Sequence, residues 1–125
     1  MLTQPEVLEI LEELAEELPE EFFDELNGGV VLQEEAKPHP QGSGDLWIMG
    51  EYCKGGYLGR YINIYYGSFS ILYGNLSREE LKKELRHTLR HEFRHHLESR
   101  AGEKDLEVID AIRLAEYKRK TDDQQ

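Results

Sequence analysis

The feature that most constrains the fold is a single long helix signal between residues 77 and 102. Ser77 and Glu80 have the spacing of a capping box, in which each side chain binds the backbone amide of the other residue at a helix start. Apolar residues then recur every four positions, at Leu81, Leu85, Leu89 and Phe93. This period predicts a buried stripe along one helix face, and Gly102 indicates the helix end.

Residues 1–76 are expected to supply the layer that covers this stripe. Thr3 and Glu6 form another capping-box pattern, which predicts an N-terminal helix that ends before Pro19. A short helix is expected after Pro19, through residue 26. Further helices are predicted at 68–73 and at 105–118.

Strands are predicted at residues 30–32, 46–49 and 57–66, and the Pro- and Gly-rich residues 37–45 are predicted to form a loop. The last two strands are expected to be antiparallel because no helix separates them. The sequence therefore predicts an α+β fold with a small mixed or antiparallel sheet, packed with N-terminal helices, the long helix and a C-terminal helix. We expect one domain over residues 1–120 and a polar tail over 121–125.

Composition limits the classes of partner. The formal net charge is −11, which argues against binding to a phosphate backbone. No run approaches the ~18 apolar residues of a membrane span. Residues 1–20 are acidic and amphipathic, unlike a secretory signal, and Cys53 is the single cysteine. These features predict a cytoplasmic protein without a disulfide.

Charge is distributed unevenly along the chain. Residues 1–35 contain Glu and Asp but no Lys or Arg, whereas residues 78–100 are rich in Lys, Arg and His. Two arrangements are open: the acidic segment packs against the basic helix, or both faces are solvated.

The chemical motif is His91-Glu92-Phe93-Arg94-His95 within the long helix. At about 100° per residue, His91 and His95 lie about 40° apart on one face and one turn apart along the axis. That spacing suits two imidazole ligands of one zinc ion. Glu92 lies about 100° from His91, beside the metal without being a ligand.

This arrangement meets the needs of peptide hydrolysis. Zinc lowers the pKa of bound water to about 7. The Glu92 carboxylate can take the proton from that water and later protonate the leaving amine. A peptide or protein substrate is therefore expected.

Three segments resemble the small bacterial zincin-like metallopeptidase family: residues 18–23, 58–65 and 88–96. The resemblance extends over nearly the whole chain. It implies a minimal zincin fold, in which the motif helix packs below a small sheet, together with a zinc ion and hydrolase chemistry.

The third metal ligand departs from the family pattern. Family members often have Gly three residues after the second His and Asp three residues after that Gly, but Glu98 and Ala101 occupy these positions here. Asp105 follows the helix-ending Gly102, and a chain reversal there would bring Asp105 back to the metal, so Asp105 is the expected ligand. The alternatives are Glu98, on the face of His91, and the pair Glu103 and Glu107.

Other chemistry-bearing residues have simpler interpretations. His96 points about 140° from His91, toward the apolar stripe, and is expected to be a hydrogen-bonded core residue. His87 and His91 form an alternative metal pair, but that pair leaves Glu92 without a role. Tyr61 and Tyr65 are expected to pack the sheet, with a tyrosine hydroxyl or Arg60 as an alternative oxyanion donor.

A rival function belongs to another class of protein. The chain would then be a non-catalytic binding or adaptor protein that keeps a zincin fold with a structural or absent metal. Four protein ligands on the metal would favour the rival, and an open position would favour the enzyme.

Overall fold

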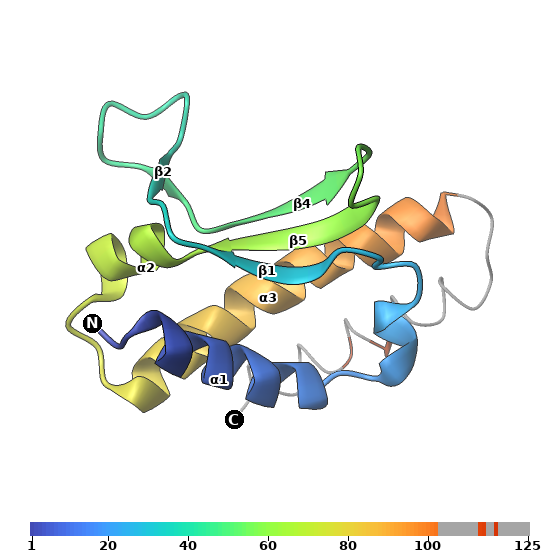
Figure 1. Cartoon of the computed structure of the whole chain (residues 1–125), viewed down its shortest axis with the longest axis horizontal. Coiled ribbons are helices and arrows are strands. Elements are labelled where there is room, and N and C mark those ends of the chain that lie inside the picture. The colour runs from blue at the N-terminus through green and yellow to red at the C-terminus, as the bar shows by residue number, and fades with distance from the viewer. Residues whose placement is uncertain (103–112, 115–116, 118–125) are drawn as a thin grey trace.

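The structure is a computed structural model, and it describes residues 1–102, 113–114 and 117. It has an α+β fold, which confirms the predicted class (Figure 1). The helices are α1 (Gln4–Glu16), the 3-10 helix η1 (Glu20–Phe23), α2 (Tyr66–Tyr73) and α3 (Arg78–Ala101). The strands are β1 (Gly29–Gln33), β2 (Lys37–Pro38), β3 (Trp47–Ile48), β4 (Gly50–Lys54) and β5 (Arg60–Tyr65).

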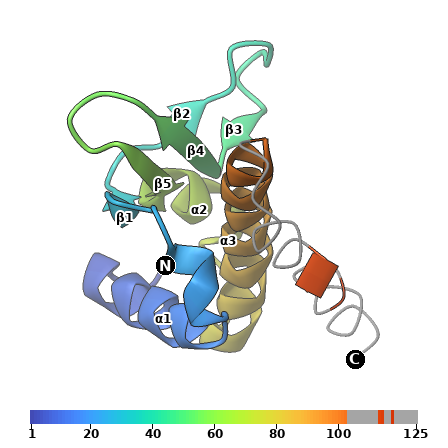
Figure 2. The same ribbon diagram turned by 90° about the vertical axis from the view of Figure 1, so that its right-hand side faces the viewer.

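Two sheets are present among the described residues. The three-stranded sheet has the order β1-β5-β4 and is mixed, because β5 is parallel to β1 and antiparallel to β4. The short antiparallel pair β2 and β3 stands away from this sheet at one end (Figures 1 and 2). Helices α1 and α3 lie on one face of the three-stranded sheet (Figure 1).

Both predicted capping boxes are present at the helix starts. The Thr3 and Glu6 pair opens α1, and the Ser77 and Glu80 pair opens α3. Gly102 is the C-cap of α3, as expected. These contacts stabilise the helix ends because they satisfy backbone amides that have no partner inside the helix.

One core joins the helices to the sheet. The predicted α3 stripe is 0–1% exposed. The stripe packs against the apolar face of α1, the inward side chains of β5 and two phenylalanines. These partners are Val7, Ile10 and Leu14 of α1, Ile62 and Ile64 of β5, and Phe22 and Phe69. The core therefore fixes α3 firmly beneath the sheet.

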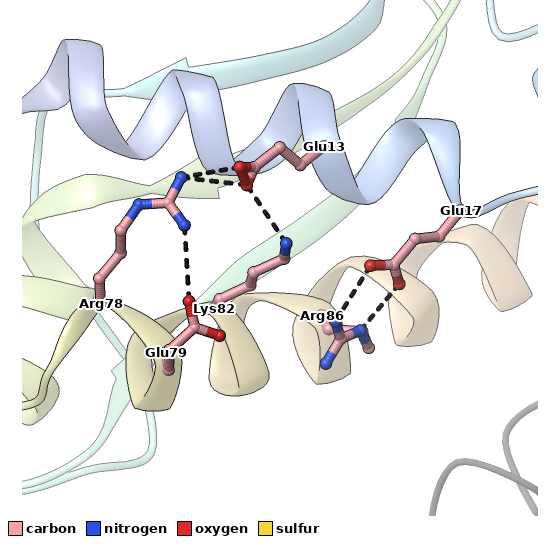
Figure 3. A network of polar contacts seen from close by, with 6 residues as sticks. All are labelled: Glu13, Glu17, Arg78, Glu79, Lys82 and Arg86. Atoms are coloured by element: carbon pink, nitrogen blue, oxygen red, sulfur yellow. Dashed lines mark hydrogen bonds and ion pairs between the residues drawn. The ribbon is translucent and has the colours of Figure 1, made fainter.

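The acidic N-terminal helix packs against the basic helix, which confirms the first of the two predicted arrangements. Glu13 binds Arg78 and Lys82 at 2.8 and 3.2 Å (Figure 3). Glu17 binds Arg86 through two hydrogen bonds of 2.8 and 3.0 Å (Figure 3). The ion pairs line the seam between α1 and α3.

Two strand predictions need correction. The predicted strand at residues 46–49 is the short strand β3, and a separate strand, β4, follows it at once. Residues 37–38 belong to β2, within the predicted loop. The sequence of β4 does not alternate between apolar and polar residues. The residues of β4 that face α3 contact polar groups there, as described below.

The predicted final helix at 105–118 lies outside the described residues, apart from residues 113–114 and 117, which are helical. Asp105, Glu103 and Glu107 also lie outside them. Across the part of the chain that is described, none of the helices combines the length and apolar character that a membrane span requires.

Candidate metal site and cleft

Helix α3 carries two side-by-side pairs of polar residues at the candidate site. His91 and His95 lie on an exposed face, whereas Glu92 and His96 lie on a buried one. Each pair is spaced by four residues and therefore spans one turn. Helix α3 thus presents an open imidazole pair beside a covered carboxylate.

The two exposed imidazoles face each other. The Nε2 atoms of His91 and His95 are 3.1 Å apart, and their ring planes are nearly perpendicular. Two ligands bound tetrahedrally at 2.0–2.1 Å lie about 3.3 Å apart, so the pair fits a zinc ion with little movement. The same separation also suits a hydrogen bond between the two rings.

An open cleft of about 1040 Å³ surrounds this pair. One wall is the edge of β4 that faces away from β5, with Gly50, Glu51 and Tyr52, and the other wall is α3. His87 lines the cleft one turn before His91, and His39 reaches it from the connection between β2 and β3. The motif helix and the edge strand therefore form the two sides of one site.

The edge of β4 over the cleft has a definite polarity. Backbone hydrogen bonds join Tyr65 to Met49 and Gly55 to Gly59, so residues 49, 51, 53 and 55 direct their backbone groups at β5. The alternate residues 50, 52 and 54 direct theirs away from β5. The backbone amide of Tyr52 accordingly points away from β5, and its interaction with the Glu92 carboxylate acts to lower the pKa of that group.

Glu92 lies beneath this edge. The residue is 6% exposed. Burial raises the pKa of Glu92 above its usual value, against the opposing effect of His95, and the negative charge of Glu51 adds to the rise. A carboxyl in such a setting exchanges protons at a higher pH than a solvated one, as a general base near neutral pH requires.

Gly50 allows the close approach of strand and helix. A Cβ atom at Gly50 would lie 2.9 Å from Thr88 Cγ2 and 3.2 Å from Glu92 Cγ. Both distances are shorter than ordinary van der Waals contact, so a glycine at this position lets β4 lie directly on the Glu92 face of α3.

A second polar cluster holds the cleft rim. Lys37 Nζ lies 2.8 Å from Glu51 Oε1, and the Tyr65 hydroxyl donates a hydrogen bond to the same oxygen. Lys37 also lies over the Tyr65 ring, 5.4 Å from its centre. The cluster fixes Glu51 beside the cleft and links β4 to β2.

His96 is a buried, hydrogen-bonded residue, as predicted. It is 0% exposed. Its Nδ1 atom lies 2.8 Å from the Tyr52 hydroxyl, and its Nε2 atom lies 2.8 Å from the Asp24 carbonyl oxygen. His96 therefore does not face the open imidazole pair.

The structure brings together only part of the predicted ligand set. Within residues 1–102, 113–114 and 117, no three His, Cys, Asp or Glu side chains are grouped closely enough to hold a metal ion. Glu98 lines the cleft but forms an ion pair of 2.7 Å with Arg94 on the helix surface. Asp105 lies outside the described residues.

The alternative oxyanion donors contact other groups. Arg60 pairs with Glu25 at 3.7 Å, and Tyr65 binds Glu51 as described above. The Tyr66 hydroxyl binds the carbonyl oxygen of Leu2 at 2.6 Å. These contacts agree with the packing role predicted for the strand tyrosines.

The sequence interpretation missed four cleft residues: His39, Gly50, Glu51 and Tyr52. The sequence carries little indication of these residues, because three of them belong to strand β4, which was not predicted. The predicted strand at 46–49 stops just before Gly50, which is the first residue of β4.

Comparison with known proteins relates the chain to a solved structure. No protein-family model matches the sequence, and no curated protein matches it. Among solved structures, a conserved hypothetical protein from T. thermophilus is 40% identical, with a TM-score of 0.72. The match covers 81% of this chain and 99% of that one, and so the chain belongs to the same protein family as this conserved hypothetical protein.

Proposed function

We propose that the protein is a cytoplasmic zinc-dependent peptide hydrolase of the zincin-like type, with Glu92 as its general base. One observation carries the proposal: the facing Nε2 atoms of His91 and His95 open into a cleft directly beside the buried Glu92 carboxylate. A pair of imidazoles with a neighbouring carboxylate on one helix is an arrangement that supports metal-assisted peptide hydrolysis.

The donor set favours zinc. Neutral imidazole nitrogen is a preferred zinc ligand, and the 3.1 Å separation is close to the value of a tetrahedral pair. Asp105 is the proposed third protein ligand, and Glu98 is the alternative. Bound at this place, zinc would supply a Lewis acid and a water of lowered pKa.

Glu92 would move the protons. Its carboxylate lies beside the histidine pair and under the edge of β4, where solvent reaches it little. It would accept a proton from the attacking water and return it to the leaving nitrogen of the peptide.

An extended peptide is the proposed substrate. Gly50 and Lys54 direct backbone groups away from β5, to an edge of β4 that pairs with no strand among the described residues and lies along the cleft. An added strand could pair there by β-augmentation and bring its backbone to the histidine pair. The net charge of −11 argues against a nucleic-acid substrate.

A non-catalytic binding protein is the second candidate. One observation favours it, because the distance between the histidines also suits a direct hydrogen bond that needs no metal. Zinc would then be structural or absent. Metal analysis of protein purified without added metal separates these two states.

The decisive variant is Glu92→Gln. It keeps the side-chain shape and removes the basicity, so we expect zinc binding like that of the parent and a loss of hydrolysis of about 10²–10⁴-fold. Glu79→Gln is the matched control, since Glu79 lies on the same helix with 84% of its side chain exposed. A mixed peptide library, read by mass spectrometry, identifies a substrate first.

Two results would reject the proposal. Equal hydrolysis by the parent and Glu92→Gln would exclude Glu92 as the base. A zinc-loaded parent that cleaves no peptide of the library would favour the binding protein.

A further inference from the structure

Tyr52 contacts α3 at two points one turn apart. Its hydroxyl lies 2.8 Å from His96 Nδ1, and its backbone amide points away from β5 and interacts electrostatically with the Glu92 carboxylate. The Tyr52 and His96 rings also lie against each other, with centres 5.3 Å apart. Tyr52 of β4 therefore interacts with both buried residues of α3, Glu92 and His96.

The hydrogen bonds of His96 fix its tautomer. The Asp24 carbonyl oxygen can only accept, so Nε2 of a neutral ring carries the hydrogen and Nδ1 accepts from the Tyr52 hydroxyl. The imidazole is thus held between β4 and the segment that follows η1.

The segment at Asp24 is itself tied to α3. Glu25 has a positive φ of 62°, which is unusual for a residue with a side chain. Its carboxylate binds Arg100 Nε at 2.9 Å. The carbonyl group that orients His96 therefore belongs to a chain segment with its own anchor on the same helix.

We infer that Tyr52 and His96 form a positioning pair, which holds the edge of β4 at a fixed distance from α3 and so places the Glu92 carboxylate in the cleft. Its catalytic consequence rests on the proposed hydrolase function. Neither residue touches the substrate in this proposal. Tyr52 acts on Glu92 through the backbone amide, and His96 acts through Tyr52.

Three variants separate the two contacts of His96. Tyr52→Phe keeps the ring and removes the hydroxyl. His96→Gln places an amide near the position of Nε2 and keeps the contact with Asp24, whereas His96→Asn places one near Nδ1 and keeps the contact with Tyr52. If the pair positions Glu92, Tyr52→Phe and His96→Gln should have similar effects, and His96→Asn should have a smaller effect.

The first readout does not depend on activity. Amide hydrogen exchange at Tyr52 reports its interaction with Glu92, and Glu92→Ala gives the exchange rate without this interaction. We expect Tyr52→Phe and His96→Gln to exchange about tenfold faster than the parent at Tyr52, and His96→Asn to stay close to the parent. Unchanged exchange in the first two variants would overturn the inference.

The second readout is catalysis by the zinc-loaded protein. Misplacement of a reacting group by about 1 Å costs up to about 10²-fold in rate, so we expect kcat to fall about 10- to 100-fold in Tyr52→Phe and His96→Gln. KM and zinc affinity should stay unchanged, and the double variant should lose no more than either single one. A fall in melting temperature with unchanged kcat would assign the pair a structural role only.

The two proposals fail separately. An inactive parent overturns the hydrolase, and the exchange rate at Tyr52 still decides whether the pair positions Glu92. An active parent with normal kcat in Tyr52→Phe overturns the positioning pair and leaves the hydrolase intact.

Discussion

The Nε2 atoms of His91 and His95 lie 3.1 Å apart across one turn of α3, on the exposed face of the helix. His91→Ala or His95→Ala should therefore abolish zinc binding, measured by metal content and by titration calorimetry. His87→Ala is the matched control, because His87 lies one turn earlier in the same cleft. Zinc loss in His87→Ala and His91→Ala, with zinc retained in His95→Ala, would assign the site to the pair His87 and His91.

His96→Ala should instead lower the stability of the fold and leave zinc binding intact. The ring is fully buried and makes two hydrogen bonds, so its removal leaves a cavity and two unpaired groups. We expect a loss of about 2–4 kcal/mol in the free energy of unfolding, with zinc stoichiometry retained. Urea unfolding and metal analysis test both parts. If this variant stays folded and binds no zinc, the ligand pair is misassigned.

The third ligand is tested by carboxylate variants. Asp105→Ala should weaken zinc binding far more than Glu98→Ala, because Glu98 is paired with Arg94 on the helix surface and Gly102 ends the helix before Asp105. Competition with a zinc chelator measures both affinities. A crystal structure with the Asp105 oxygens well beyond about 2.2 Å from zinc would exclude this ligand.

Gly50→Ala should disturb both stability and the site. The new methyl group would meet Thr88 Cγ2 at 2.9 Å, so strand and helix must separate or Thr88 must rotate. We expect about 1–3 kcal/mol of destabilisation. Thr88→Ser removes the opposing methyl group, so the double variant should recover part of the loss in thermal and urea unfolding. If the double variant recovers no stability, the strain does not arise from the contact with the Thr88 methyl group.

Acid should weaken the seam between α1 and α3. Hydrogen bonds from Arg86 lower the pKa of Glu17 below 4.5, its ordinary value. A lowered folded-state pKa adds stability above pH 4.5, and this contribution disappears as the pH falls through the lowered value. Glu17→Gln should therefore cost about 1 kcal/mol near neutral pH and progressively less as the solution becomes more acidic than the ordinary pKa.

The control for this pH effect is the exposed neighbour Glu16. Urea unfolding of Glu16→Gln at about pH 7 and about pH 3 should follow the parent at both values. A Glu17→Gln protein whose deficit is the same at both values would show that the carboxylate charge contributes nothing to the seam.

Local signals predicted the helices well. These signals are the capping boxes at Thr3 and Ser77 and the apolar period of α3. Each involves residues three or four positions apart, so it can be recognised within one short stretch of sequence. The histidine pair was predicted for the same reason. Helical spacing alone also placed His96 in the core.

The edge strand was not predictable in this way. Gly50 and Tyr52 face the polar groups Thr88, Glu92 and His96 of α3, so β4 lacks an alternating apolar pattern. Its environment is set by residues as far as 44 positions further along the chain. The strand was missed because its inward face belongs to the candidate site, where packing rules give way to polar contacts.

The order in which the chain is made gives the ion-paired seam a further consequence. Glu13 and Arg78 are 65 positions apart, and Glu17 and Arg90 are 73 apart. At about 5–20 residues per second, α1 leaves the ribosome roughly 3–15 s before its partner helix exists. Contacts of such long range form slowly, because a large loop must close first. The ion pairs between α1 and α3 can therefore form only after the whole of α1 and most of α3 have been synthesised.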